Sequence, residues 1–143
     1  MADLTTRKVI ASWKVKEAKD NVPMAIDRKN QRLFIGCEPG KLVTYDLKTE
    51  QVVSSIEISK EADGIYYDAK RSQIYISCAE GFIDVIKQRT PNSYQSIAKI
   101  PTVSGAGTSL FIPDLDLFVL AVPQTEKNSA EMRIYKATVF EQE

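Results

Sequence analysis

Short runs of apolar and β-branched residues recur along the chain, separated by charged residues, glycine or proline. Two clear runs are residues 32–37 and 73–78, each of which follows a charged turn and precedes a turn that contains glycine. Runs of this length between turn signals are typical of β-strands. Residues 16–20 are helix-forming in composition but carry no apolar stripe, so we expect a loop there. The pattern predicts an all-β chain.

The chain contains an internal repeat. Residues 27–40 align with residues 68–81, and Asp, Cys and Gly coincide at a separation of 41 positions. Residues 3–12 align with residues 46–55 at a separation of 43 positions. Two interlocking matches with nearly the same spacing indicate a repeat architecture.

Each full unit contains four short strand candidates. A weaker third unit contains three, and Ala121 falls where the other two units have cysteine. Four strands in a unit of about 42 residues predict the blade of a β-propeller. A β-sandwich is the alternative, but a sandwich does not require a recurring unit. The predicted strands are residues 23–26, 32–37, 41–46, 51–58, 64–67, 73–78, 82–87, 94–100, 109–112, 117–122 and 132–136.

We predict a single domain over residues 1–143. Four-stranded antiparallel blades are expected at residues 20–58 and 60–100, and three strands of a last blade at residues 105–137. An outermost strand at residues 3–15 would close a blade in trans. Known propellers have about four to eight blades, so about three blades per chain form a half propeller.

Such an open arc leaves an apolar sheet face uncovered at each end. Exposing one of these faces costs on the order of 10 kcal/mol at ~25 cal/mol per Å². We therefore predict a homodimer in which the two arcs close a six-bladed ring by exchanging end strands. Two alternatives stay open: the chain is the C-terminal half of a longer propeller, or it completes the propeller of another protein.

Composition narrows the function classes. Hydrophobic residues make up 43% of the chain and charged residues 27%, as in ordinary soluble proteins. Lys and Arg together number 19, as do Asp and Glu, so there is no basic excess and we predict no nucleic-acid partner. No apolar stretch reaches the ~20 residues of a membrane span, and the N-terminus lacks the apolar core of a secretory signal. We therefore expect no membrane contact and a cytoplasmic location.

The chain has no histidine, which removes nucleophile systems built on Ser, His and Asp or on Cys and His. Cys37 and Cys78 could pair or bind a metal, but we expect both to be buried packing residues. The glycine-rich residues 105–109 lack the lysine and the helix of a phosphate cradle, and we expect them to connect two blades. We predict no catalytic residue, no cofactor and no metal.

Carboxylates are the remaining candidates for chemistry, because Ca²⁺ binds oxygen ligands. Asp27 and Asp68 precede charged turns, where Asp commonly accepts backbone N–H groups, so a role in the turn is favoured for both. Asp63 and Gly64, together with residues 21–23, lead into inner strands near the expected axial mouth, where a small-molecule or protein ligand would bind. The candidate calcium ligands are Asp63, Asp68, Asp114, Asp116 and Glu80.

Three aromatic residues could form a platform for a sugar or a base. They are Trp13, Tyr66 and Tyr67. For Trp13 we favour packing against a neighbouring blade, because a large ring in an outer strand normally buries itself there.

Residues 33–36 (LFIG) and 74–77 (IYIS) lie in strand-turn units that resemble the YVTN-type (YncE-like) β-propeller repeats of bacteria and archaea. Residues 101–113 and 131–135 resemble a segment near the C-terminal end of such proteins. The resemblance covers nearly the whole chain and implies a propeller fold.

The chain departs from that family at Cys37 and Cys78, which replace an asparagine of the repeat. It is also shorter than usual members and lacks the export signal that many of them carry. Because the family is largely without an assigned activity, the resemblance implies architecture and little function. We predict a non-enzymatic module that self-associates into a closed ring and serves as a binding or interaction scaffold. A carboxylate- and Ca²⁺-dependent lactonase-like hydrolase is the alternative.

Overall fold

The computed structural model describes residues 2–16 and 18–140. Most of this part forms two four-stranded sheets, blade 1 and blade 2, and one three-stranded sheet, sheet 3. Blade 1 contains β3 (Asp20–Asp27), β4 (Arg32–Glu38), β5 (Lys41–Asp46) and β6 (Gln51–Glu57). Blade 2 contains β7 (Ala62–Asp68), β8 (Gln73–Cys78), β9 (Phe82–Thr90) and β10 (Ser93–Pro101). Sheet 3 contains β11 (Ser109–Ile112), β12 (Leu117–Val122) and β13 (Glu131–Lys136), with a 3-10 turn, η1 (Pro113–Leu115), after β11.

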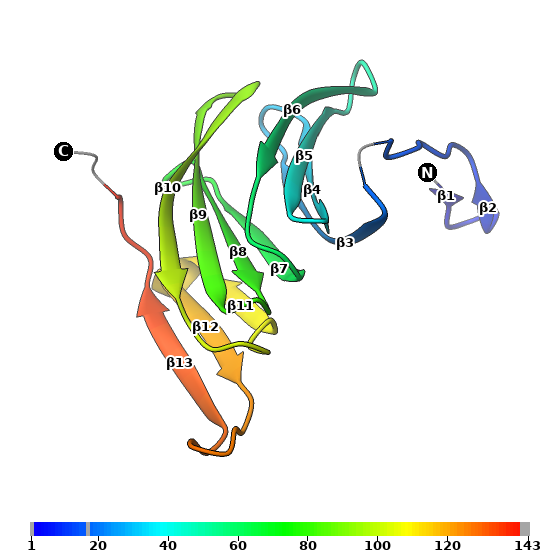
Figure 1. Ribbon diagram of the computed structural model, residues 1–143. Coiled ribbons are helices and arrows are strands. Elements are labelled where there is room, and N and C mark those ends of the chain that lie inside the picture. The colour runs from blue at the N-terminus through cyan, green and yellow to red at the C-terminus, as the bar shows by residue number, and fades with distance from the viewer. Residues whose placement is uncertain (1, 17, 141–143) are drawn as a thin grey trace.

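The strands of each sheet follow one another in sequence order, and neighbouring strands are antiparallel. The first strands β3 and β7 contact each other, and so do β7 and β11, so the three sheets converge on their first strands (Figure 1). Consecutive blades of a propeller are arranged in this way around an axis. Within the described residues, no helix is long and apolar enough to span a membrane.

Apolar cores fill both spaces between the sheets. Side chains alternate along a strand, so β4 directs Phe34 towards blade 2 and Ile35 towards the opposite face. Phe34 is fully buried and packs with Ile74 of blade 2. On the other side of blade 2, the rings of Tyr75 and Phe118 meet edge-on with centroids 6.0 Å apart. Blade 2 therefore has a neighbouring sheet on both faces, whereas blade 1 and sheet 3 each have one on a single face.

The turn between the first two strands has the same backbone in all three sheets. Gln31, Ser72 and Asp116 adopt left-handed φ values of 54°, 51° and 54°. The backbone oxygen of each accepts a hydrogen bond from the chain near the end of the third strand. The donors are the N–H groups of Leu47, Gln88 and Ala137, at 3.0, 2.9 and 2.7 Å. Sheet 3 is thus a regular copy of the blade as far as its third strand.

The register of sheet 3 corrects one detail of the sequence alignment. Cys37 pairs with Lys41, the first residue of β5, and Val122 pairs with Glu131, the first residue of β13. Val122, and not Ala121, therefore occupies the cysteine position. The reason is that η1 leaves the turn of the third unit as long as the turns of the other two.

Asp27 and Asp68 are buried carboxylates that organise the turns of blades 1 and 2. Asp27 accepts hydrogen bonds from the Asn30 N–H at 3.2 Å, the Asn30 side-chain amide at 2.7 Å and the Gln88 amide of blade 2 at 3.0 Å. Asp68 accepts the Tyr75 hydroxyl at 2.7 Å and forms an ion pair with Arg71 at 2.9 Å. Both act in their turns, as their positions in the sequence indicate, and Asp27 also joins blade 1 to blade 2.

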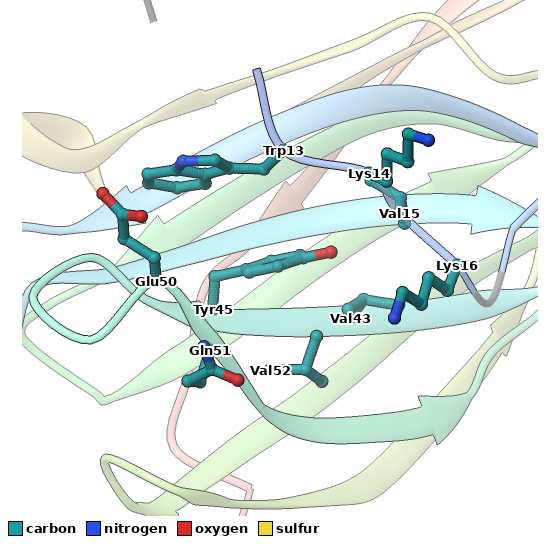
Figure 2. Close-up of a pocket in the computed structure, with 9 residues that line it drawn as sticks. All are labelled: Trp13, Lys14, Val15, Lys16, Val43, Tyr45, Glu50, Gln51 and Val52. Atoms are coloured by element: carbon teal, nitrogen blue, oxygen red, sulfur yellow. The ribbon is translucent and has the colours of Figure 1, made fainter. Parts of the chain in front are cut away.

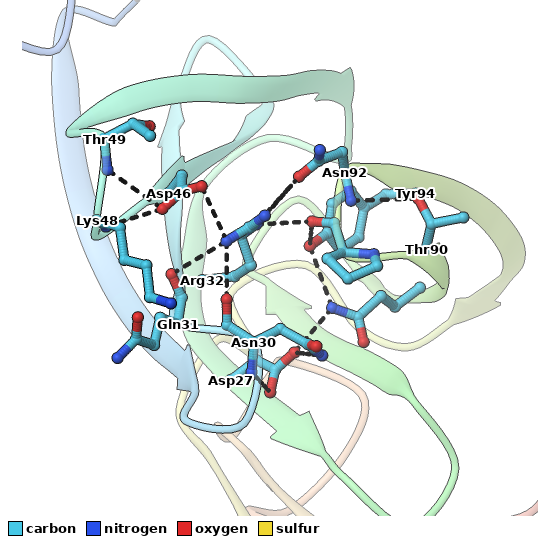
Figure 3. Close-up of polar contacts among 12 residues, drawn as sticks. Asp27, Asn30, Gln31, Arg32, Asp46, Lys48, Thr49, Thr90, Asn92 and Tyr94 are labelled. Atoms are coloured by element: carbon cyan, nitrogen blue, oxygen red, sulfur yellow. Dashed lines mark hydrogen bonds and ion pairs between the residues drawn. The ribbon is translucent and has the colours of Figure 1, made fainter.

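Arg32 forms a second polar link between these two blades (Figure 3). Its guanidinium donates to the Pro91 carbonyl at 3.0 Å and to the Asn92 side chain at 2.8 Å, both in the turn that leads into the fourth strand of blade 2. Gln73 is the equivalent residue of blade 2, and its amide donates to the Thr138 carbonyl at 3.1 Å. The chain after β13 therefore lies where blade 2 has the turn into its fourth strand.

The outermost strand at residues 3–15, predicted to close a blade in trans, stays a prediction. In the single copy, β2 (Lys8–Val9) pairs with β1 (Ala2–Asp3). Strand backbone needs a partner for its N–H and C=O groups. Within the described part of this copy, no strand pairs with residues 10–15, so they remain irregular.

Candidate functional site

The N-terminal turn is a copy of the turn that joins the third and fourth strands of blade 1. Asp3 accepts hydrogen bonds from the N–H groups of Thr5 at 2.8 Å and Thr6 at 3.2 Å. The backbone N–H groups of Thr6 and Thr5 thereby lower the pKa of the Asp3 carboxyl. In blade 1 the donors to Asp46 are the N–H groups of Lys48 at 2.8 Å and Thr49 at 3.3 Å. The left-handed residue also recurs, at Arg7 (φ 58°) and Glu50 (φ 60°).

Trp13, Val15 and Ala18 lie on the outer face of blade 1. Trp13 and Val15 pack on the buried residues Ile35 and Val43, and Trp13 stacks on Tyr45 with ring centroids 6.2 Å apart. In blade 1 the corresponding residues at the end of the fourth strand pack in the same way on blade 2. Those residues are Ile56 and Ile58. The segment therefore occupies the place of a fourth strand from a blade that would precede blade 1.

A pocket of about 420 Å³ opens beside this segment (Figure 2). In Figure 2 the Trp13 and Tyr45 rings face each other, and Lys14, Lys16 and Glu50 bring charged groups to the rim. The Trp13 indole nitrogen is buried and has no hydrogen-bond partner among the described residues. The full lining is Trp13, Lys14, Val15, Lys16, Val43, Tyr45, Glu50, Gln51 and Val52. The pocket thus combines an apolar floor with a polar rim.

Further apolar side chains are exposed on the same face of blade 1. Met24 is 62% exposed and Ile26 is 39% exposed. The strand register places Ile65 of blade 2 at the position of Met24, and Ile65 is buried against blade 1. Blade 1 therefore exposes apolar side chains on the face that, in blade 2, is covered by the neighbouring blade.

Sheet 3 has a complementary exposed face. Leu110, Met132 and Ile134 are 55%, 75% and 64% exposed. The residues of blade 2 at the positions of Met132 and Ile134 are Ile83 and Val85, both buried against sheet 3. In blades 1 and 2 this face is covered by the sheet that follows in the chain. In sheet 3 the same face is exposed.

The expected axial mouth at Asp63 and Gly64 is a close contact between blade 2 and the chain before β11. A Cβ on Gly107 would overlap the Asp63 carboxylate, and a Cβ on Gly64 would overlap the Ser109 hydroxyl. The Ser77 hydroxyl lies 2.6 Å from the Ser109 hydroxyl and donates to the Gly107 carbonyl at 2.6 Å. The glycines here leave room for the side chains of Asp63 and Ser109.

Residues 105–109 form the connection between blade 2 and sheet 3. Gly105 has a left-handed φ of 90°, and its N–H donates to the Ala79 carbonyl at 2.7 Å. Tyr66, one of the candidate platform residues, donates its hydroxyl to the Ser109 carbonyl. Tyr66 and Tyr67 pack in two different cores rather than side by side with Trp13.

Three of the other candidate carboxylates, Asp68, Asp116 and Glu80, bond to nearby protein groups. Arg71 joins Asp68 to Asp116, which it contacts at 2.8 Å, and hydrogen bonds from Lys70 and Arg71 lower the pKa of Asp116. Glu80 accepts the Lys60 N–H at 2.7 Å, while Asp114 is exposed in η1. Among residues 2–16 and 18–140, no three His, Cys, Asp or Glu side chains gather closely enough to hold a metal ion.

Both cysteines are buried. Burial raises the pKa of Cys78. Cys37 lies in the core under Trp13, and Cys78 lies in the core between blades 1 and 2. Each packs on the equivalent face of its blade, which in blade 2 points towards blade 1.

Comparison with known proteins defines the fold. No protein-family model matches the chain, and no curated protein matches it in sequence. The solved structure of hydrazine synthase from Kuenenia stuttgartiensis superposes with a TM-score of 0.78 at 18% identity, over 94% of this chain and 38% of that one. The β-propeller domain of Swd1 from Myceliophteria thermophila gives 0.65 at 12% identity, over 81% and 39%. The fold is that of a β-propeller.

A third propeller neighbour is a 6-phosphogluconolactonase-like protein from Bacteroides uniformis, with a TM-score of 0.66 at 8% identity over 82% of this chain and 37% of that one. The chain therefore spans less than two fifths of the length of these three structures. The predicted fold class is confirmed, whereas membership of the YVTN-type family stays a prediction.

Proposed function

We propose that the protein is a non-enzymatic β-propeller module that self-associates into a closed ring and serves as an interaction scaffold. The observation that carries this proposal is the pair of exposed end faces. Met132 and Ile134 of sheet 3 are exposed at positions that are buried in blade 2, and Met24 of blade 1 is exposed in the same way. Apolar sheet faces of this kind are stable only when another surface covers them.

A second copy of the chain supplies surfaces that match both ends. Two arcs related by a two-fold axis bring sheet 3 of each copy onto blade 1 of the other, which closes the ring without leaving an end. Two chains with two blades and one partial blade each give six blades in all. A closed ring then offers its axial mouth for a protein or small-molecule ligand.

Sedimentation equilibrium at micromolar concentration tests self-association. We expect twice the chain mass of 16.0 kDa. A mass of one chain across the whole concentration range would contradict the proposal and favour a subunit that completes the propeller of another protein.

The hydrolase alternative draws on the lactonase-like neighbour and on the exposed carboxylates, and it differs in its response to calcium. For a scaffold without metal we expect the same thermal midpoint in millimolar Ca²⁺ and in chelator. A gain of stability in Ca²⁺ that chelator reverses would favour the hydrolase.

A further inference from the structure

We infer that residues 8–14 of one copy form the fourth strand of sheet 3 in a second copy, and that the two copies exchange these strands reciprocally. The inference rests on the proposed ring and specifies how it closes. It assigns an occupant, the N-terminal segment of the second copy, to the open edge of β13.

The chain carries both parts of one divided blade. Within residues 18–140, sheet 3 has three strands, whereas blades 1 and 2 have four each. The N-terminal segment begins with the turn that follows a third strand, as the shared geometry of Asp3 and Asp46 shows. Its next residues, Trp13 and Val15, already pack on blade 1 as the end of a fourth strand does. Sheet 3 of a second copy can supply the first three strands of the blade to which this fourth strand belongs.

The two parts do not meet within one copy. The N-terminal segment lies on the outer face of blade 1, while sheet 3 packs on the far side of blade 2. Figure 1 shows β2 and β13 at opposite ends of the molecule. Within the described residues no strand pairs with the outer edge of β13, so we assign that edge to the N-terminal segment of a second copy.

The repeat fixes the register of this pairing. β1 and β2 pair as Ala2 with Val9 and Asp3 with Lys8, which reproduces the pairs that close the β5–β6 hairpin. Continuing this register along β13 places three residues of the N-terminal segment opposite three residues of the second copy. The pairs are Lys14 with Glu131, Trp13 with Met132, and Ser12 with Arg133, by analogy with Glu57–Lys41, Ile56–Leu42 and Ser55–Val43.

Two of these pairs are chemically complementary. Blade 1 places Glu57 opposite Lys41, and the exchanged strand places Lys14 opposite Glu131, so an opposite-charge pair recurs with its signs reversed. Opposite charges directly across two strands are stabilising. Met132 meets Trp13 and covers the pocket over Tyr45. At the other end, Lys8 faces Lys136, and both are exposed.

The exchange displaces β1. In the register above, Ala2 and Asp3 take the same place as Tyr135 and Lys136 of the second copy. The two-residue pairing of β2 with β1 is therefore replaced by pairing of residues 8–14 with β13. A short hairpin is a marginal structure in water, so the longer strand pair is favoured.

Two charge reversals test the pairing in trans. Lys14→Glu places two carboxylates opposite each other, and Glu131→Lys places two ammonium groups opposite each other. Each closed ring contains the pair twice, so we expect either variant to raise the dimer dissociation constant by about tenfold at low salt. Lys60→Glu, which reverses an exposed lysine in the connection between blades 1 and 2, is the control and should leave the constant within about twofold.

Mixing the two single variants is the decisive measurement. A heterodimer of Lys14→Glu with Glu131→Lys contains opposite charges at both junctions, so the mixture should regain the wild-type dissociation constant. Variants that each weaken the dimer but do not rescue each other would overturn the strand exchange. A dimer that neither reversal weakens would overturn it too, and in both cases the proposed ring would stand. A monomeric wild-type chain would remove the ring and the exchange together.

Discussion

At the scale of single residues, the buried carboxylates decide how the turns hold the blades together. Asp27 is 1% exposed and bonds to Asn30 in its own turn and to Gln88 in blade 2. Burial by itself raises the pKa of Asp27, but the hydrogen bonds from Gln88 and Asn30 outweigh it and lower the pKa below the usual range. A carboxyl whose pKa falls on folding contributes stability above its unfolded value of about 3.9, and that stability is lost as the pH falls through the folded value.

Asp27→Asn therefore changes how stability depends on pH. We expect the variant to lose about 2 kcal/mol of unfolding free energy at pH 7, because it loses hydrogen bonds to a charged group. The difference from wild type should shrink as the pH is lowered from about 5 towards 3. Urea unfolding at both ends of this range measures it, with exposed Asp114→Asn as the control. A difference that stays constant with pH would show that the Asp27 charge does not contribute.

Sequence reasoning at this scale succeeded where a residue acts through its neighbours in the chain. Asp27 and Asp68 were predictable as turn residues, because an Asp side chain reaches N–H groups two and three residues on. The left-handed conformations of Gln31 and Ser72 were not, since neither residue type favours φ > 0 as glycine does. The contact of Asp63 with Gly107 depends on how two sheets approach each other, and local sequence does not specify that.

At the scale of elements, the period of the repeat predicted the strands of the two blades well, because each hairpin is closed by its own turn. The outermost strand at residues 3–15, which would close a blade in trans, stays a prediction. Residues 8–14 carry the pattern of a fourth strand, but a strand forms only where partner backbone is present. The alignment of residues 3–12 with residues 46–55 already indicated that the N-terminal segment corresponds to a fourth strand. The turns at Asp3 and Asp46, which have the same hydrogen bonds, support this correspondence in the structure.

A substitution on the exposed face of sheet 3 tests whether this face is an interface. Ile134→Glu should leave the stability of the isolated chain within about 0.5 kcal/mol, because Ile134 is 64% exposed there. In the ring the same side chain lies between two sheets, so the substitution should abolish dimerisation at micromolar concentration. Leu115→Glu is the matched control, since Leu115 is 63% exposed but lies in η1, away from the face. If both variants dimerise equally well, the face is not an interface.

At the scale of the whole molecule, the two ends of the arc act as one interface. Blade 2 shows what a completed environment contributes: both of its faces are buried, and its buried core includes Ile74, Tyr75 and Ile76. Blade 1 and sheet 3 reach that state only when they cover each other in a ring. Association and the last part of folding are then coupled, so stability depends on protein concentration.

Trp13 reports on ring closure directly, because it is the only tryptophan in the chain. In the single copy its ring stacks on Tyr45 beside an open pocket, and in the ring Met132 of the second copy covers it. Its emission maximum should therefore shift to shorter wavelength, and acrylamide quenching should fall, as concentration rises through the dissociation constant. Glu131→Lys should move both changes to about tenfold higher concentration. A spectrum that does not change while the mass doubles would place the dimer contact elsewhere on the molecule.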